Sequence, residues 1–84
     1  MVDSGKASKS AINGVIKDIS DYTTIVRKEL ELIMREAESL SDVWQDHKFR
    51  QFIERVEAMK YSVESELNTI NWAKHELEEK VDMM

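Results

Sequence analysis

The chain has 84 residues, a length that fits one domain. A domain of this size buries too little surface to be very stable without a cross-link or a partner. It has no Cys, which excludes disulfides and thiolate metal sites and leaves oligomerisation as the remedy. The formal net charge is −5, and Lys and Arg are scattered among Asp and Glu. This charge pattern argues against a nucleic-acid-binding protein.

The chain shows no signal for membrane insertion or for general secretion. No apolar run approaches the ~18 residues that a membrane span needs. Residues 1–10 read MVDSGKASKS, without the hydrophobic core or the cleavage pattern of a signal peptide. We therefore expect a cytoplasmic protein without a membrane span that, if it is exported, leaves without a cleaved signal peptide.

The first predicted element is a long helix over about residues 8–40, preceded by a flexible tail over residues 1–7, which are small and polar. Ser8 or Ser10 is the candidate N-cap residue. Two interleaved heptad sets give the alternating three–four spacing of one apolar helix face. These sets are Ile12, Ile19, Val26, Ile33 and Leu40, and Ile16, Thr23, Leu30 and Ala37.

A polar segment over about residues 41–46 interrupts this rhythm and is predicted to be a turn, because Ser and Asp side chains bond to nearby backbone groups. Asp42 with Gln45 fits a capping box, and Asp46 is the alternative cap of the next helix. Because the connection is short, the two helices fold back antiparallel. Trp44 lies in this turn, where a large aromatic side chain can pack across both helices.

The second predicted helix covers about residues 47–81 and has its own heptad set, Phe49, Val56, Val63, Ile70 and Leu77. The neighbouring apolar positions are Phe52, Ile53, Met59, Leu67, Ala73 and Val81. The charged residues between the stripes are expected on the solvated side, namely Glu54, Arg55, Glu57, Lys60, Glu64, Glu78 and Lys80. Trp72 lies outside these apolar positions, and a partner contact and a flank of the core are equally good interpretations for it. For Tyr61 we favour the core or the contact surface of a dimer.

Together the elements predict an all-α protein with a single domain over residues 8–84, an antiparallel two-helix hairpin. Val15 and Tyr22 widen the apolar face of the first helix, which leaves a second apolar flank that four helices close better than two. The sequence therefore predicts a homodimer that forms a four-helix bundle. The expected dimer or partner seam is Ile12, Ile16, Ile19, Val26, Leu30, Ile33, Val56, Met59, Val63, Leu67, Ile70 and Leu77.

No constellation of residues indicates catalysis or a cofactor. The segment from His75 to Glu79 begins like a zinc-protease helix motif, but the position four after His75 is Glu and not His. A di-iron helical bundle needs the motif Glu-x-x-His. The residue three positions before His47 and the one three positions before His75 are both Trp, so the motif is absent. Nothing orders a Ser, a His and an Asp into a nucleophile with its base. We therefore predict no enzyme activity, no metal and no other cofactor.

Residues 44–56, WQDHKFRQFIERV, resemble the centre of the WXG-type, ESAT-like family of small type VII secretion proteins. Trp44 stands at the Trp position of that family's Trp-x-Gly turn, and Phe49, Phe52 and Val56 follow five, eight and twelve residues later, as in the family pattern. Asp46 replaces the Gly, and Asp is among the few residues that tolerate a left-handed backbone there. Neither Tyr in the chain is followed four residues later by the acidic residue of the family's export signals.

The resemblance implies a non-enzymatic secreted effector, or a carrier or chaperone that escorts larger toxins into a type VII machine through helical-bundle contacts. It places the turn motif at Trp44, Asp46, Phe49 and Phe52. The implied partner is a second copy, with a heterodimer as the alternative, formed with a related hairpin or with a toxin's helical domain. The competing hypothesis is a cytoplasmic helical-hairpin adaptor or assembly subunit unrelated to secretion, which shares the seam without needing the Trp–Phe–Phe spacing.

Overall fold

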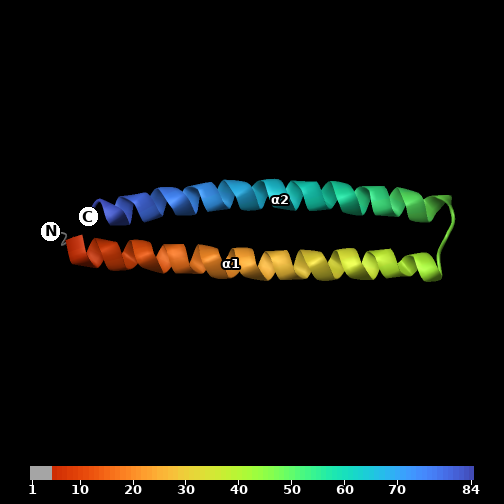
Figure 1. Cartoon of the computed structure of the whole chain (residues 1–84), viewed down its shortest axis with the longest axis horizontal. Coiled ribbons are helices and arrows are strands. Elements are labelled where there is room, and N and C mark those ends of the chain that lie inside the picture. The colour runs from red at the N-terminus through yellow and green to blue at the C-terminus, as the bar shows by residue number, and fades with distance from the viewer. Residues whose placement is uncertain (1–4) are drawn as a thin grey trace.

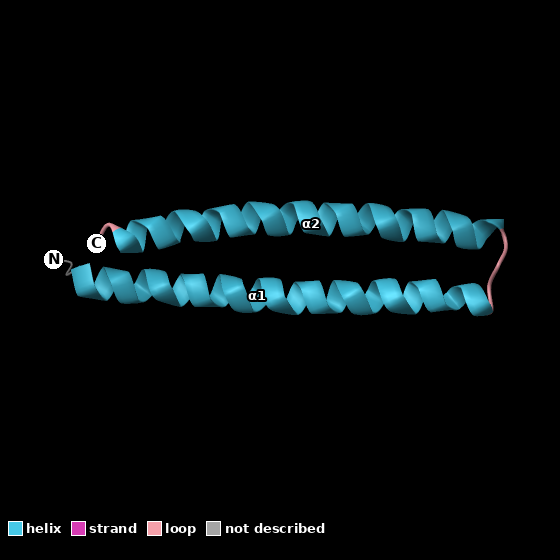
Figure 2. Ribbon diagram, viewed as in Figure 1, coloured by secondary structure: helices cyan, strands magenta, loops and turns pink. Residues whose placement is uncertain are grey.

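The computed structural model describes residues 5–84 and forms them into two long helices joined by a tight connection. Helix α1 covers Gly5–Ser39, a short 3-10 helix η1 covers Leu40–Asp42, and helix α2 covers His47–Asp82. The helices lie side by side and antiparallel, with the two chain ends together and the turn at the opposite end (Figure 1; Figure 2). The result is a rod of 64 × 18 × 16 Å. The predicted all-α helical hairpin is thereby confirmed over these residues.

Helix α1 begins earlier than the sequence pattern predicted, at Gly5 rather than at about residue 8. Ser8 and Ser10, the expected N-cap residues, consequently lie inside the helix. Residues 1–4 of the predicted tail lie outside the described residues. No residue between Gly5 and Ser39 is Pro, and Gly14 adopts the helical backbone, so nothing interrupts the main-chain hydrogen bonding of this helix.

The turn is built from backbone and side-chain hydrogen bonds that end the first helical segment and begin α2. The Leu40 carbonyl accepts from the N–H groups of Val43 and Trp44 at 3.0 and 2.8 Å, which ends the first helical segment. Asp46 then adopts an extended backbone, with φ −94° and ψ −177°, and its Oδ1 accepts the Phe49 N–H at 3.1 Å. Asp46 is therefore the N-cap residue of α2.

This geometry decides between the two caps that the sequence left open, and it shows that the turn does not require a left-handed backbone at Asp46. Gln45 donates from Nε2 to the Ser41 carbonyl at 2.9 Å, so the capping box between Asp42 and Gln45 does not form. No non-glycine residue in the described part of the chain has a positive φ. Asp46 therefore stands at a position where its side-chain oxygen accepts a hydrogen bond and where the backbone does not need the freedom of glycine.

The buried residues form a narrow strip between the two helices. They are Thr23, Leu30 and Ala37 of α1, and Val56 and Leu67 of α2. Leu67 is the most buried, with 2% of its surface exposed. The Thr23 hydroxyl donates to the Ser20 carbonyl at 3.0 Å, which satisfies the one polar side chain in this strip. Two helices alone cannot enclose more than such a strip, so most other side chains keep contact with solvent.

Candidate functional site

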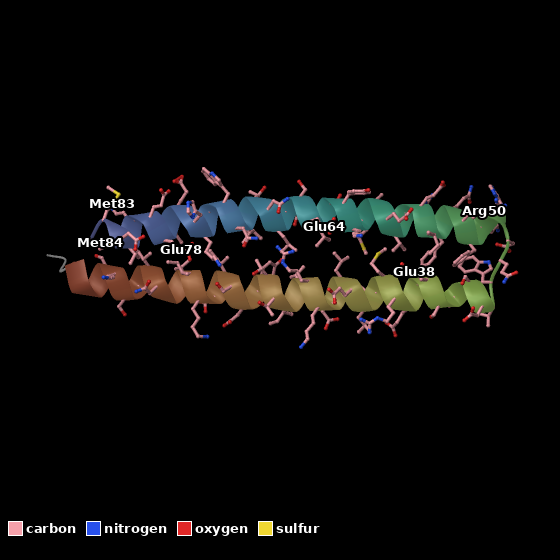
Figure 3. The ribbon with its side chains drawn as sticks, in the orientation of Figure 1. Glu38, Arg50, Glu64, Glu78, Met83 and Met84 are labelled. Atoms are coloured by element: carbon pink, nitrogen blue, oxygen red, sulfur yellow. The ribbon has the colours of Figure 1, made fainter. Side chains whose placement is uncertain are left out.

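Three aromatic side chains close the turn end of the hairpin. The ring of Trp44 meets the ring of Phe49 edge-on, with centroids 5.4 Å apart, and lies 5.7 Å from the ring of Phe52 at a tilt of 33°. All three residues are half-buried. Because the Asp46 cap fixes where α2 starts, it also fixes where Phe49 and Phe52 stand relative to Trp44. The structure thus brings the four predicted turn-motif residues together at one end of the rod, where Figure 3 labels Arg50.

Most residues of the predicted seam lie between the helices of this one hairpin. Leu30, Val56 and Leu67 are buried, and the half-buried members are Ile12, Ile16, Ile19, Val26, Val63, Ile70 and Leu77. Ile33 and Met59 are exposed at 43% and 37%, and Met34 takes the inward position expected for Ile33. An α-helix of 3.6 residues per turn drifts against a strict seven-residue repeat, which explains this exchange.

Polar side chains enter the seam where the sequence suggested a solvated surface. Lys60, Glu64 and Glu78 are half-buried, which corrects the expectation that they belong to the open side of α2. Figure 3 labels Glu64 and Glu78 on the side of α2 that faces α1. Lys74 reaches across the seam and donates from Nζ to the Ser20 hydroxyl at 3.3 Å. Long charged side chains can cover apolar surface with their stems while their charged ends stay wet, so these positions remain compatible with a packed seam.

One long face of the hairpin, here called the polar face, carries an open groove of about 480 Å³ along part of its length. Its floor is Leu30, Met34 and Leu67. The charged residues along its walls are Arg27, Glu31, Arg35 and Glu38 from α1, and Lys60 and Glu64 from α2. Three cations face three anions here, so the groove has no net charge that would select a charged ligand. Mixed charge of this kind is typical of a solvated helix surface.

The opposite long face, here called the apolar face, carries large hydrophobic side chains from both helical segments. Residues seven and eleven apart share a helix face, and each segment supplies four such residues with the same seven–eleven–seven spacing. The exposed residues of the apolar face are Val15, Tyr22, Ile33 and Leu40 from α1 and the adjoining η1, and Met59 from α2. Its other α2 residues, Phe52, Ile70 and Leu77, are half-buried and also border the neighbouring helix. Ile25 and Leu32 extend it at its α1 edge, exposed at 60% and 44%.

The sequence pattern indicated this second flank only through Val15 and Tyr22, and Ile25 and Leu32 were missed. Both break the heptad sets, and a helical-wheel projection of α1 places them on the outward side of the helix, between Tyr22 and Arg35. Tyr61 and Trp72 are exposed at 73% and 65% and lie outside the apolar face, on the outer side of α2. Neither therefore belongs to the core of the hairpin.

The titratable side chains do not converge on a reactive centre. His75 is mostly exposed, and its two ring nitrogens lie 3.9 Å from carboxylate oxygens of Glu78 and Glu79. Over the described residues, no three His, Asp or Glu side chains are grouped so as to hold a metal ion. Neither helix, within the described part of the chain, combines the length and the apolar character needed to cross a membrane.

Comparison of the chain with protein-family models, with curated proteins and with solved structures finds no match. Function must therefore be inferred from the residues and their geometry alone. The two relevant features are the aromatic cluster at the turn and the apolar face, whose α1 side is exposed and whose α2 side is largely half-buried.

Proposed function

We propose that this chain is a non-enzymatic binding protein that pairs through its apolar face into a four-helix bundle and serves type VII secretion as a WXG-like effector, carrier or chaperone. The observation that carries the proposal is the contrast between the two long faces of the hairpin, one charged and one apolar. Soluble monomers rarely expose a contiguous apolar patch of more than a few hundred Å², and larger ones mark interaction sites.

The thin core of the single hairpin supports the same proposal. Among the described residues the buried hydrophobic side chains are Leu30, Ala37, Val56 and Leu67. A core of this size offsets little of the conformational entropy lost by ordering two helices of 35 and 36 residues. Pairing along the apolar face adds buried area over the whole length of the rod, which makes the bundle the stable form.

The turn supports the link to WXG-like proteins. The resemblance concerns Trp44, Phe49 and Phe52, and these are the residues whose rings pack on one another. The role of Asp46 as N-cap gives a physical reason for an Asp in place of the family's Gly. In this proposal the Trp-x-Asp turn is a variant that trades backbone freedom for a capped second helix.

The first experiment tests the pairing by light-scattering mass after size exclusion. We expect a mass near twice the 9.8 kDa of the chain. Ile33→Glu places a charge in the apolar face and should shift the mass toward one chain, while Arg35→Glu on the polar face is the matched control and should not. A wild-type mass of one chain over the whole concentration range would contradict self-pairing and favour a heterodimer with a related hairpin or a toxin's helical domain.

The tie to secretion needs its own test, because a cytoplasmic adaptor or assembly subunit is the second candidate. The missing Tyr–acid export pair favours that alternative. We expect the chain to appear in the culture medium of a type VII-competent bacterium and to stay inside when the secretion ATPase is deleted. Trp44→Phe keeps the turn packed and should reduce export, whereas Trp72→Phe should not. Retention of the wild type in both strains would favour the adaptor.

A further inference from the structure

Two large aromatic side chains lie on the outer side of α2, where neither α1 nor the proposed pairing covers them. Tyr61 is 73% exposed and Trp72 is 65% exposed. The buried Val56 and Leu67 mark the side of α2 that faces α1, and both aromatic residues lie on the opposite half of the helix. Met59, the exposed α2 residue of the apolar face, precedes Tyr61 by two positions and so lies about 160° from it around the helix.

The two aromatic residues belong to a stripe with the alternating three–four spacing of a helix-packing seam. This outer stripe consists of Ala58, Tyr61, Ser65, Asn68 and Trp72, and all five residues are exposed. Tyr61 and Trp72 are separated by about 16 Å along the helix axis, at 1.5 Å per residue. The two residues between them are smaller, so the stripe is bulky at its aromatic positions and lower between them. A second helix that lies along it can place a large side chain between the two rings.

The outer stripe carries no charge, although charged residues make up 35% of the chain. The adjoining exposed residues Ser62 and Thr69 are also uncharged, and the Thr69 hydroxyl is satisfied within α2 by the Ser65 carbonyl at 3.2 Å. The outer side of α1 differs, because it carries four exposed charged residues, Lys17, Asp21, Lys28 and Arg35. An uncharged stripe with exposed Trp and Tyr is unlike an ordinary solvated helix surface. Trp and Tyr are enriched among the residues that dominate binding at protein interfaces.

Acidic residues predominate along the border of the outer stripe. The exposed charged residues within one helix turn of it, over residues 54–76, are Glu54, Arg55, Glu57, Glu66 and Glu76. Four carboxylates therefore accompany one guanidinium, and the bordering His75 is counted as neutral at pH 7. Glu57 precedes Tyr61 by four residues and Glu76 follows Trp72 by four, so each aromatic ring has a carboxylate as its neighbour on the helix surface.

The remaining charged residues of this stretch are directed elsewhere. Lys60 and Glu64 line the groove of the polar face, and Figure 3 labels Glu64 on the side of α2 that faces α1. Lys74 reaches the Ser20 hydroxyl across the seam. The next turn at either end adds no net charge, since its charged residues are Arg50, Glu78, Glu79 and Lys80. The potential along the outer stripe is therefore negative.

We propose that the outer stripe binds one α-helix of a partner protein, with Lys or Arg along both edges of that helix and large apolar residues between them. Charge complementarity selects this occupant. A second copy of the chain would set two acidic borders against each other, and an anionic lipid surface would meet the same repulsion. The outer stripe is separate from the apolar face, so this inference goes beyond the proposed pairing and does not depend on it.

Each part of such a helix finds a counterpart on α2. Its apolar residues pack against the rings of Tyr61 and Trp72 and fill the lower surface at Ser65. Its cations lie beside Glu57 and Glu76, where the faces of the neighbouring rings add to the attraction. The Asn68 amide, between the two rings, can both donate and accept a hydrogen bond.

The fluorescence of Trp72 gives a direct test. Trp44→Phe removes the other of the two Trp residues and keeps a ring in the turn, so the remaining emission comes from Trp72. The probes are two synthetic helical peptides with the same Leu and Ala positions, one with Lys and one with Glu along both edges. The Lys peptide should shift the emission to shorter wavelength and bind at least about tenfold more tightly than the Glu peptide. Equal affinities, or binding of the Lys peptide without a change in Trp72 emission, would overturn the inference.

Two charge variants separate local complementarity from the net negative charge of the chain. Glu57→Gln combined with Glu76→Gln removes the carboxylates beside the two rings and should weaken binding of the Lys peptide about fivefold. Glu31→Gln combined with Glu38→Gln removes the same charge from the polar face and is the matched control, with an affinity within about twofold of wild type. Equal weakening in both variants would show unspecific attraction and contradict the proposal.

Aromatic variants test the contact itself, with a fluorophore on the Lys peptide as the readout. Tyr61→Ala and Trp72→Ala should each weaken binding about tenfold, whereas Trp72→Phe keeps a ring and should stay within about twofold of wild type. Because both residues are exposed, the helicity and the light-scattering mass should not change. Unchanged affinity in both Ala variants would overturn the proposal.

The competing occupants have their own signatures. A wild-type mass above two chains that falls in Trp72→Ala would assign the outer stripe to further copies of this chain. A shift of Trp72 emission with phosphatidylcholine vesicles but not with the Lys peptide would assign it to a membrane surface. Either result would overturn the inference of a cationic partner helix.

Discussion

The two ends of the rod differ, although the same heptad pattern continues through both. At the turn end the chain connects the helices, Asp46 caps α2, and Trp44 packs on Phe49 and Phe52. At the open end, where the chain begins and ends, no described residue before Thr23 or after Leu67 is buried. A shallow groove of about 410 Å³ opens there between α1 and α2, lined by residues that include Asn13, Ile16 and His75.

A repeating apolar pattern therefore does not distribute stability evenly along the rod. A residue between the helices at the turn end is shielded from solvent by the aromatic cluster as well as by the facing helix. A residue between the helices at the open end is shielded by the facing helix alone. Local opening is expected where apolar contacts are fewest, so the open end should fray first. A partner along the apolar face would add contacts where the single hairpin has fewest.

The largest expected effect compares a central seam residue with one at the open end. Leu67→Ala should lower the free energy of unfolding by about 3 kcal/mol, because it leaves a cavity at a site that is 2% exposed. Ile16→Ala, at a half-buried position of the open end, should cost no more than about 1 kcal/mol. Chemical denaturation at one fixed protein concentration measures both. Equal losses would show that the two regions are equally packed.

The aromatic cluster is the next test of the turn end. Trp44→Ala should cost about 2–3 kcal/mol, below the value for a fully buried aromatic residue, because Trp44 is half-buried. Trp44→Phe should recover most of this loss, since a ring remains to pack on Phe49. The same denaturation assay measures both variants. A loss of unfolding free energy below about 1 kcal/mol for Trp44→Ala would contradict the view that the aromatic cluster stabilises the turn end.

The helix cap predicts a smaller effect at the same end. Asp46→Ala removes the acceptor of the Phe49 N–H and should cost about 1 kcal/mol, whereas Asp46→Gly should cost only a few tenths. Asp42→Ala is the control, since no capping bond to Asp42 is found in the turn. Thermal unfolding followed by circular dichroism would measure these differences. A cost at Asp42 that matched the one at Asp46 would contradict the assignment of the cap.

The open end can also be strengthened. Gly14 lies in the helical backbone, and a Cβ added there would have no neighbouring atom within 4 Å. Gly14→Ala should therefore raise the free energy of unfolding by about 0.5–1 kcal/mol, because Ala loses less conformational freedom than Gly in a helix. Hydrogen exchange of the α1 amides near this position should slow in the same variant. Unchanged exchange would mean that fraying at the open end does not pass through this part of α1.

The smallest expected effect concerns the exposed ion pair between Lys17 and Asp21, at 2.8 Å. The hydrogen bond and the charge of Asp21 raise the pKa of Lys17 above its ordinary value of 10.5. Any stabilisation from this shift is present below that value and is lost as the pH rises through the raised pKa. Denaturation of Lys17→Gln should differ little from wild type at neutral pH and should converge with it in strong alkali. A large difference at neutral pH would contradict this weak, solvent-screened pair.

Much of the fold was predictable from local signals. The absence of Pro, the repeated apolar spacing and the polar run before Trp44 were enough for two helices and a turn. The start of α1 was missed because Ser8 and Ser10 can each serve either as an N-cap or as an ordinary residue inside a helix. The local sequence pattern does not distinguish these two cases. The inward place of Met34 was missed because helical drift depends on how the two helices cross.

Periodicity, connection length and composition were sufficient to specify the helical hairpin, its antiparallel direction and its surplus of apolar surface. They did not specify that Asp46 caps α2, that Trp44 packs on Phe49 and Phe52, or that the surplus collects on one face, and the folded structure was needed for these. The choice of Asp46 over Asp42 as the cap is decided within the turn. The collection of the surplus on one face depends on the rotation and relative height of the two helices. Rotation and height are set by packing between residues far apart in the chain, which no local pattern encodes.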